Sequence, residues 1–224
     1  MGTLYIVGTP IGNLEDVTLR ALRVLKEVDF VLCEDTRVTR KLLDRFNVKT
    51  PTLSYHQHSK QERMEHIFHL LKEDKNLALV SDAGTPGISD PGNELIEFLL
   101  KKDAELKIVP VPGSSALTAL ASVAGVPMDK FLFLGYPPHK KKRRKFFEEI
   151  AESKYPVIFY ESPYRILKSL KELHNVSPQL SVVVGRELTK KFETIYRGDI
   201  ANILSQLESR PPKGEFVVLA HSFS

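Results

Sequence analysis

Hydrophobic and polar residues alternate along this chain with two periods, which predict a regular succession of strands and helices. Short apolar runs rich in β-branched residues predict strands near 3–8, 29–33, 77–81 and 106–110, with a further short strand around Leu53. Leucine and isoleucine at helical spacing predict intervening helices near 18–27, 37–45, 60–73 and 92–102. This order is typical of a largely parallel sheet joined by crossover helices.

A proline- and glycine-rich junction, Pro110 to Ser115, interrupts this pattern. We place a domain boundary there, which gives an N-terminal α/β domain of residues 1–111 and a C-terminal α/β domain of residues 112–224. The strands predicted in the second domain lie near 131–135, 156–160, 181–186, 192–197 and 215–221, and its helices near 115–124, 141–152, 164–174 and 199–208. The strands at 181–186 and 192–197 leave no room for a helix between them, so we expect a mixed second sheet.

Composition agrees with a folded enzyme or binding protein in a reducing compartment. The 224 residues are 42% hydrophobic and 27% charged, which is ordinary for a globular protein. The apolar runs are far shorter than the roughly 20 residues of a membrane helix, and the amino terminus enters a strand without a basic leader. Cys33 is the only cysteine, which rules out an internal disulfide. We expect a cytoplasmic protein without membrane contact.

Three polar loops follow predicted strands and are candidates for a ligand site. The loop Gly8–Asn13 is not a dinucleotide fingerprint, because it lacks the GxGxxG spacing and its proline removes a backbone donor; it is either a plain turn or a ligand loop. In the segment Cys33–Arg37, helix capping explains one carboxylate and leaves Glu34 and Arg37 unexplained. The loop 81–92 contains three glycines, two prolines and two aspartates, and capping explains only its last third.

Two other features carry charge or metal-binding side chains. His56 and His58 would share a face of a strand, and His66 and His69 lie nearby, but no third ligand has a recognisable spacing, so we expect no metal. Six consecutive cations, residues 140–145, follow Pro137-Pro138-His139. They form either a phosphate-binding lid that becomes ordered on a polyanion or a solvated helix face.

Seven segments, in order, resemble the ribosomal RNA methyltransferases of the tetrapyrrole methylase superfamily, the class III enzymes that use S-adenosylmethionine. These segments are YIVGTPIGNLEDVTLRAL, CEDTR, ALVSDAGTPGISDPG, VPGSSALTAL, FYESPYRI, RELTKKFETIY and KGEFVVL. The resemblance implies 2′-O-methylation of a cytidine ribose in the decoding region of 16S ribosomal RNA. It also implies a homodimer, and a cleft between the two domains that holds S-adenosyl-L-methionine.

The resemblance also assigns residues to the cofactor pocket and leaves one difference of length. The cofactor-binding set is Pro10, Ile11, Asp82, Gly84, Thr85, Ile88, Ser115, Ala116, Tyr160 and Glu187. Members of the family often continue past the KGEFVVL segment into a small helical extension, whereas this chain ends at Ser224. If the extension binds RNA elsewhere in the family, the basic run and the dimer surface must do so here.

Methyl transfer to a ribose hydroxyl needs positioning and a group that accepts the hydroxyl proton. We expect Glu34 and Asp82 to be the catalytic carboxylates. The substrate-binding set, which would contact a splayed or single-stranded RNA or the small ribosomal subunit, is Arg37, His56, Lys140, Lys141, Lys142, Arg143 and Arg144. The alternatives are a tetrapyrrole methyltransferase, a methyltransferase acting on a protein side chain and a non-enzymatic RNA-binding module.

Overall fold

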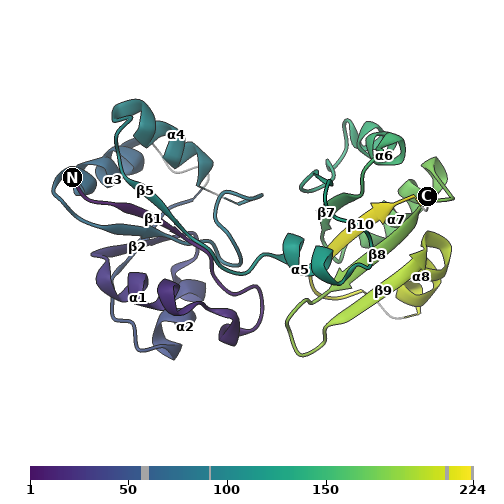
Figure 1. Ribbon diagram of the computed structural model, residues 1–224, viewed down its shortest axis with the longest axis horizontal. Coiled ribbons are helices and arrows are strands. Elements are labelled where there is room, and N and C mark those ends of the chain that lie inside the picture. Colours follow the sequence, from purple (N-terminus) through teal and green to yellow (C-terminus); the bar gives the residue numbers. More distant parts are fainter. Residues whose placement is uncertain (57–60, 91, 210–211, 223–224) are drawn as a thin grey trace. The chain divides into compact units, whose positions relative to one another are not determined.

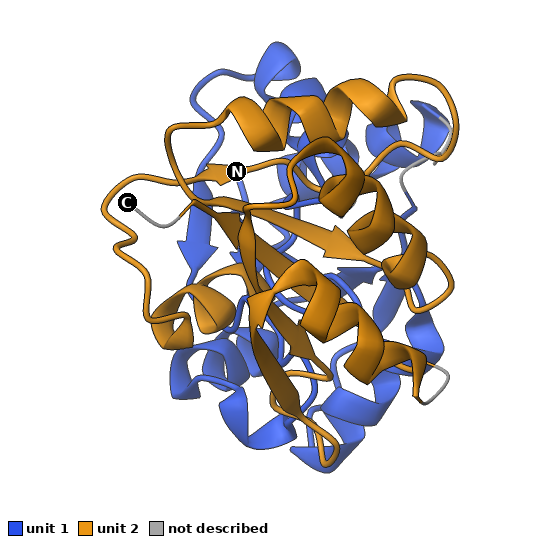
Figure 2. Ribbon diagram, turned by 90° about the vertical axis from the view of Figure 1, so that its right-hand side faces the viewer, with its two compact units in different colours: residues 1–115 blue, residues 116–224 orange. Residues whose placement is uncertain are grey.

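The computed structural model describes residues 1–56, 61–90, 92–209 and 212–222 (Figure 1). The chain divides into two compact units, Met1–Ser115 and Ala116–Ser224 (Figure 2). The division falls at the end of the Pro110–Ser115 junction, a few residues beyond the boundary placed from the sequence.

The first unit contains a parallel sheet of five strands in the order β3-β2-β4-β1-β5. Its strands are β1 (Leu4–Val7), β2 (Phe30–Cys33), β3 (Thr52–Ser54), β4 (Leu77–Leu79) and β5 (Ile108–Val111). Its helices are α1 (Leu19–Glu27), α2 (Thr36–Arg45), α3 (Gln61–Lys72) and α4 (Asn93–Lys102), with a short 3-10 turn at Leu14–Asp16. Because the strands are parallel, their carboxyl ends all meet at one edge of the sheet.

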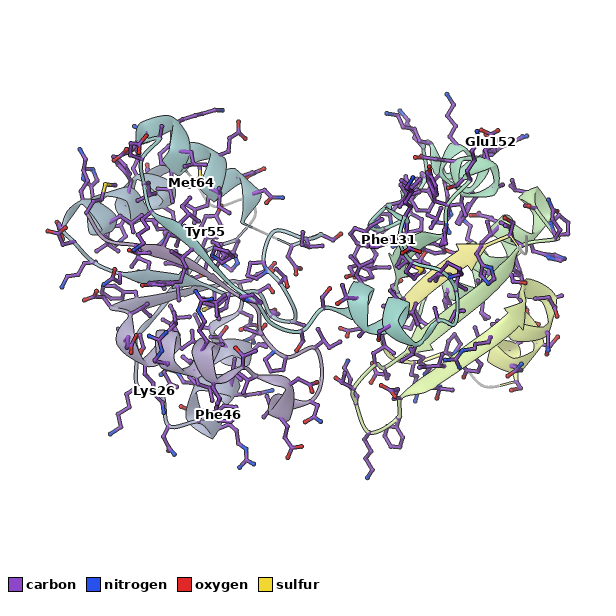
Figure 3. The ribbon with its side chains drawn as sticks, viewed as in Figure 1. Lys26, Phe46, Tyr55, Met64, Phe131 and Glu152 are labelled. Carbon is purple, nitrogen blue, oxygen red and sulfur yellow. The ribbon has the colours of Figure 1, made fainter. Side chains whose placement is uncertain are left out.

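The order of the strands fixes which face each helix covers. From β1 to β3 the chain steps across the sheet in one direction, and from β3 to β5 it steps back in the other. Right-handed crossovers therefore place α1 and α2 on one face and α3 and α4 on the opposite face, as Figure 1 shows. Phe46 packs with the first pair, and Tyr55 and Met64 pack with the second (Figure 3). Both faces of the sheet are thus buried.

Two helices of the first unit begin at side chains that cap their first turn. The Thr18 hydroxyl accepts a hydrogen bond of 3.0 Å from the Ala21 N–H at the beginning of α1. The Asp35 carboxylate accepts one of 2.8 Å from the Arg37 N–H at the beginning of α2. Each bond satisfies a backbone donor that the first turn of a helix leaves without an intrahelical partner.

The second unit contains a mixed sheet in the order β6-β7-β10-β8-β9. Its strands are β6 (Leu132–Phe133), β7 (Val157–Glu161), β8 (Ser181–Arg186), β9 (Thr194–Asp199) and β10 (Phe216–His221). Its helices are α5 (Ala116–Val123), α6 (Arg143–Glu152), α7 (Ile166–Val176) and α8 (Ile200–Glu208). β6 and β7 are parallel and the other pairs are antiparallel. Its main core joins one face of the sheet to α6, α7 and α8.

The structure confirms the α/β class, the parallel first sheet and the mixed second sheet, with shifts at helix ends. Helix α6 begins at Arg143 rather than at 141, because Lys142 has a left-handed backbone with φ of 65°. Helix α7 begins at Ile166, two residues after its expected start, since Arg165 has a non-helical ψ of −13° with φ of −122°. The 3-10 turn at Leu14–Asp16 was not predicted. Over the described ranges, no helix has the length and apolarity needed to span a bilayer.

Candidate functional site

Loops that follow β1, β2 and β4 meet at the carboxyl edge of the first sheet. These three strands are neighbours, since β4 lies between β2 and β1. The helix that follows β4 lies on the opposite face from the helices that follow β1 and β2, so the loops diverge at this edge. In open α/β sheets ligands bind where loops diverge in this way.

The loop after β1 and the loop after β4 are joined by Thr9 and Gly84. Their backbones exchange two hydrogen bonds, of 2.9 Å from the Thr9 N–H and 3.1 Å from the Gly84 N–H. The buried Thr9 hydroxyl also donates to the carbonyl oxygens of Ser81 and Gly84, at 3.1 and 3.3 Å. Gly84 has φ of 84°, a left-handed conformation that glycine adopts without steric cost. These hydrogen bonds therefore hold the two loops together.

The Pro110–Ser115 junction belongs to the same structure. The backbones of Gly8 and Gly113 approach so closely that a Cβ on Gly8 would lie 2.8 Å from the Gly113 Cα. Thr85 donates a hydrogen bond of 3.5 Å to the Ser114 carbonyl. The glycines in both motifs are explained by this close approach of two backbones.

A cavity of about 450 Å³ opens beside these loops, and we call it the acidic cavity. Its lining residues come from the segment after β2, the end of β3 and the loop after β4: Glu34, Asp35, Thr36, Arg37, Ser54, His56 and Asp82. The cavity thus brings together both predicted catalytic carboxylates and two of the predicted substrate-binding residues, Arg37 and His56. The sequence did not single out Ser54, whose hydroxyl lies 2.8 Å from Nε2 of His56.

Asp35 and Arg37 form a fixed ion pair at the rim of the acidic cavity. The guanidinium donates from Nε to Oδ1 at 3.0 Å and from Nη2 to Oδ2 at 2.7 Å. These hydrogen bonds, together with the bond from the Arg37 backbone N–H, lower the pKa of the Asp35 carboxyl to about 2. The side chain of Arg37 is 87% exposed. Asp35 therefore holds a charged, solvent-facing guanidinium in place.

Asp82 is tied to the segment after β2 and lines the acidic cavity from the other side. Its Oδ1 accepts a hydrogen bond of 3.2 Å from the Asp35 N–H. Glu34 is half-buried, whereas Asp82 is exposed. Two carboxylates beside an arginine can accept a proton from a bound hydroxyl and pair with a phosphate of the same substrate.

A second pocket of about 220 Å³ shares Asp82 with the acidic cavity. It is lined by Thr9, Pro10, Leu14, Val38, Thr39, Lys41, Leu42, Val80, Ser81 and Asp82. The apolar side chains of Leu14, Val38 and Leu42 here lie next to a carboxylate. This donor set fits a ligand with an apolar surface and hydroxyl or cationic groups, as S-adenosylmethionine has.

The predicted cofactor-binding residues of the first unit fall into one neighbourhood with one outlier. Pro10 and Asp82 line the 220 Å³ pocket. A Cβ at Gly84 would lie 3.4 Å from Ile11 Cγ2, and Thr85 lies on Ser114. Ile88 lies further along the loop and is 44% exposed.

The remaining predicted cofactor-binding residues lie at the end of the first unit and in the second. Ser115 ends the first unit and Ala116 begins α5 in the second. In the second unit, Tyr160 pairs with Val217 of β10, and Gly185 pairs with the same residue from the other side. Tyr160 and Glu187 therefore lie at the same end of the second sheet. The ring of Tyr160 makes edge contacts with Phe133 and Tyr136, at centroid distances of 4.9 and 5.6 Å.

The Glu187 carboxylate is held by an ammonium and a backbone N–H of the second unit. Burial opposes its ionisation, but the Lys190 ammonium at 2.9 Å and the Glu215 backbone N–H at 3.0 Å hold the pKa of its carboxyl below the ordinary value. Its side chain also lies against Gly214, where an added Cβ would come within 2.4 Å of Cδ. Glu187 thus clips the segment before β10 to the end of β8, which links the RELTKKFE and KGEF segments.

The structure corrects the expectation that the whole basic run faces RNA. Lys140, Lys141, Lys142 and Arg144 are exposed, but Arg143 is only 6% exposed. Its guanidinium lies among Glu172, Ser169 and the Pro138 carbonyl. Arg143 is the first residue of α6 on the side that packs against α7, so its charge is satisfied inside the unit.

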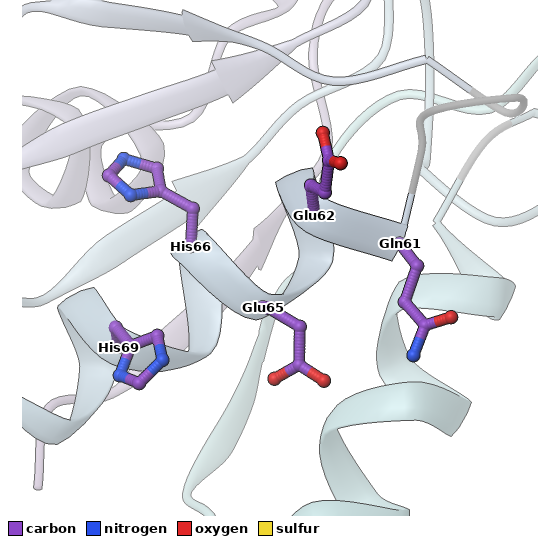
Figure 4. A pocket seen from close by; sticks show the side chains of 5 residues that line it. All are labelled: Gln61, Glu62, Glu65, His66 and His69. Carbon is purple, nitrogen blue, oxygen red and sulfur yellow. The ribbon is translucent and has the colours of Figure 1, made fainter.

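The histidines of α3 do not converge on a common point. Gln61, Glu62, Glu65, His66 and His69 line a shallow surface pocket, and Figure 4 shows Glu62 and Glu65 pointing to opposite sides of the helix. Glu65 is paired with Lys102 at 2.7 Å. His58 lies outside the described residues. In the parts of the chain that the structure describes, no group of three His, Cys, Asp or Glu side chains is arranged to hold a metal ion.

The likeness of this chain to known proteins defines its class as a methyltransferase of the tetrapyrrole methylase type. The model of the tetrapyrrole (corrin/porphyrin) methylases matches residues 3–204, and this chain belongs to that family. The family depends on S-adenosylmethionine, so the predicted cofactor is confirmed.

Relatives within the family share sequence over almost the whole chain. The ribosomal RNA small subunit methyltransferase I of Thermotoga maritima is 43% identical over 219 residues, which are 98% of this chain and 98% of the relative. The protein of the same name from Vibrio cholerae is 45% identical over 98% of this chain and 77% of its own length. The Thermotoga relative is therefore about as long as this chain, whereas the Vibrio relative is longer.

Solved structures support the fold. A cobalt-precorrin-4 methyltransferase superposes with a TM-score of 0.73 at 22% identity, covering 97% of this chain and 94% of its own. A diphthine synthase superposes with a TM-score of 0.76 at 13% identity, covering 99% and 90%. At these identities the likeness concerns the fold alone.

Proposed function

We propose that this protein transfers a methyl group from S-adenosylmethionine to the 2′-oxygen of a cytidine ribose in the decoding region of 16S ribosomal RNA. The observation that carries the chemistry is the acidic cavity, where Glu34, Asp82 and Arg37 lie together at the carboxyl edge of a parallel sheet. The names of the relatives that are 41–45% identical over nearly the whole chain support the substrate.

The cofactor would lie at the loops joined by Thr9 and Gly84, with Pro10, Asp82 and the 220 Å³ pocket on the first unit. The further residues proposed for it are Ile11, Thr85, Ile88, Ser115, Ala116, Tyr160 and Glu187. When bound, S-adenosylmethionine supplies a methyl group activated by its sulfonium sulfur.

The ribose hydroxyl must lose its proton when its oxygen takes the methyl group, and a carboxylate of this chain would accept that proton. Glu34 and Asp82 are the proposed acceptors, because both line the acidic cavity and a ribose hydroxyl is too weakly acidic to lose its proton unaided. Arg37 would pair with a phosphate beside the target ribose through the guanidinium donors that Asp35 does not use. His56 would contact the substrate from the rim formed with Ser54.

The substrate would be the 16S RNA or the small ribosomal subunit, bound as a splayed strand so that the 2′-hydroxyl is presented free of its neighbours. Lys140, Lys141, Lys142 and Arg144 would contribute cations. The proposal includes a homodimer and a cytoplasmic location; light scattering of the purified protein measures the former.

The decisive experiment offers labelled S-adenosylmethionine and the purified protein to small subunits from cells that lack the corresponding gene. Labelling of the RNA, followed by mapping of an alkali-resistant phosphodiester bond on the 3′ side of a cytidine, supports the proposal. Transfer to a tetrapyrrole instead, or to ribosomal protein, assigns the site to another substrate. Cofactor binding without transfer to any of the three contradicts the proposed reaction.

A further inference from the structure

Arg143 and Arg165 form the centre of a buried ionic network in the second unit. Both guanidiniums lie on Glu161, whose side chain is fully buried at the end of β7, and Arg165 reaches it at 2.8 Å. Arg143 also donates from Nε to Glu172 at 2.5 Å and from Nη2 to the Ser169 hydroxyl at 2.6 Å. The Ser169 hydroxyl in turn donates to Glu161. A buried charge of this kind is retained only where such partners satisfy it.

Both arginines also hold the backbone of one loop. Arg143 donates from Nη1 to the Pro138 carbonyl at 3.1 Å, and Arg165 donates from Nη1 to the Pro137 carbonyl at 3.1 Å. The two prolines have a restricted φ and no N–H of their own. Two guanidiniums and two prolines thus fix the segment that leads into the basic run.

The fixed segment presents cations and an aromatic ring to solvent. Lys140, Lys141 and Lys142 follow the two prolines and are exposed. Tyr136 precedes them, is 52% exposed, and lies edge-on against Tyr160. Cations beside an exposed aromatic ring are what a single nucleic acid strand needs, because phosphates pair with the cations and a base stacks on the ring.

We propose that residues 136–142 form a preformed RNA-binding loop, in which Tyr136 stacks on a base and Lys140–Lys142 pair with phosphates, and that Arg143 and Arg165 are the positioning residues that hold it. The inference rests on the proposed function for the identity of the RNA. It divides the six consecutive cations into those that bind and one, Arg143, that anchors.

A substitution that keeps the charge separates anchoring from binding. An ammonium replaces a guanidinium well where a phosphate needs a point charge, but it cannot reach several acceptors in a planar fork. Arg143→Lys should therefore raise the Kd for a single-stranded fragment of the decoding region about tenfold. Arg23→Lys is the control, since Arg23 is an exposed arginine of α1 that pairs with Glu27 at 2.8 Å, and it should leave the Kd within about twofold. Cofactor binding by calorimetry should be unchanged in both variants, which shows that they are folded.

The rate of trypsin cleavage measures, in the absence of RNA, how firmly Arg143 holds the loop. The wild type and both variants keep the trypsin sites at Lys140, Lys141 and Lys142. The rate of cleavage at these sites, followed by mass spectrometry, therefore reports how often the loop opens. Arg143→Lys should be cut there about ten times faster than the wild type, and the control Arg23→Lys at the wild-type rate. Equal rates in the two variants, or an Arg143→Lys protein that binds RNA like the wild type, would overturn the anchoring role.

The binding surface has its own test. Replacing Lys140, Lys141 and Lys142 by glutamine should reduce the slope of log Kd against log salt concentration by about 2, since each phosphate contact on a single strand contributes about 0.7. Tyr136→Leu should weaken binding about tenfold, and Tyr155→Leu, an exposed tyrosine elsewhere in the unit, should not.

The two levels of the proposal fail differently. A wild-type protein that methylates the small subunit while the triple glutamine variant binds and methylates equally well contradicts the loop and leaves the function intact. A wild-type protein that binds this RNA with the expected salt dependence but transfers no methyl group to the small subunit contradicts the proposed function and leaves the RNA-binding loop intact.

Discussion

Thr9 and Gly84 exchange two backbone hydrogen bonds, of 2.9 and 3.1 Å, and thereby join the loop after β1 to the loop after β4. Thr9 and Gly84 are 75 residues apart in sequence, and this link holds their two loops together at the proposed cofactor site. The left-handed φ of Gly84 is what allows it.

Gly84→Ala should lower the free energy of unfolding by about 1–2 kcal/mol, because a Cβ is disfavoured in the left-handed region. It should also weaken S-adenosylmethionine binding, because backbone strain at residue 84 would loosen the two hydrogen bonds that join its loop to the loop after β1. Gly125→Ala is the matched control: its φ of 72° is similar, but no atom lies within 4 Å of the added Cβ. We expect the control to lose stability and keep its affinity; calorimetric titration and urea unfolding measure both. Equal affinity losses in the two variants would show that the loop link is irrelevant to the cofactor.

Glu34→Gln and Asp82→Asn should each lower kcat, by about 10²–10⁴ for the residue that accepts the proton. The amide keeps the shape of the side chain and removes its basicity. Single-turnover methylation at saturating cofactor and RNA isolates this step from binding. If both variants transfer methyl at the wild-type rate, neither carboxylate is the acceptor.

Arg37→Lys should raise KM for RNA with a smaller effect on kcat, because a lysine cannot keep two bonds to Asp35 and still present a fork to a phosphate. We expect an increase of about five- to tenfold, which corresponds to about 1–1.4 kcal/mol, the net contribution of one ordinary hydrogen bond. Arg45→Lys, at the far end of α2 and exposed, is the control. A fall in kcat at unchanged KM would instead place Arg37 in the chemical step.

The Asp35–Arg37 pair predicts a defined pH dependence. The folded pKa of Asp35 is about 2, below the ordinary value of 3.8 for an aspartate. The stability that its ionised form adds is therefore fully present above about pH 4 and is lost as the pH falls toward 2. Asp35→Asn keeps the helix cap, since asparagine caps as well as aspartate, and removes the charge. The difference in unfolding free energy between wild type and variant should therefore shrink between pH 4 and pH 2. Urea unfolding at a series of pH values measures it, and a difference independent of pH would contradict the pairing.

Much of the fold followed from local pattern. Val31, Leu32 and Cys33 form an apolar run of strand length, and Thr18 and Asp35 stand where helix caps are needed, so the elements and their starts were predictable one segment at a time. The starts of α6 and α7, at Lys142 and Arg165, were harder to predict. The left-handed turn at Lys142 is formed by a residue type that does not favour this conformation.

The candidate site was predicted as parts and assembled only by the structure. Glu34 and Arg37 were visible as polar residues that capping left unexplained, and Asp82 as part of a long loop. That Asp82 accepts a hydrogen bond from the Asp35 N–H depends on β4 lying beside β2, an order that no local pattern encodes. Ser54 gave no signal, since an isolated serine at the end of a strand is common.

The sequence by itself determined the periods of burial, the caps, the glycines and prolines of the loops and the presence of six adjacent cations, because each of these depends on residues close together in the chain. Tertiary structure decided what became of those cations. Arg143 and Arg144 are neighbours of the same type, yet the first is buried against Glu161 and Glu172 and the second is 87% exposed. The difference arises because α6 packs against α7 and β7 along one side, and only that packing brings distant carboxylates to one of two equal charges.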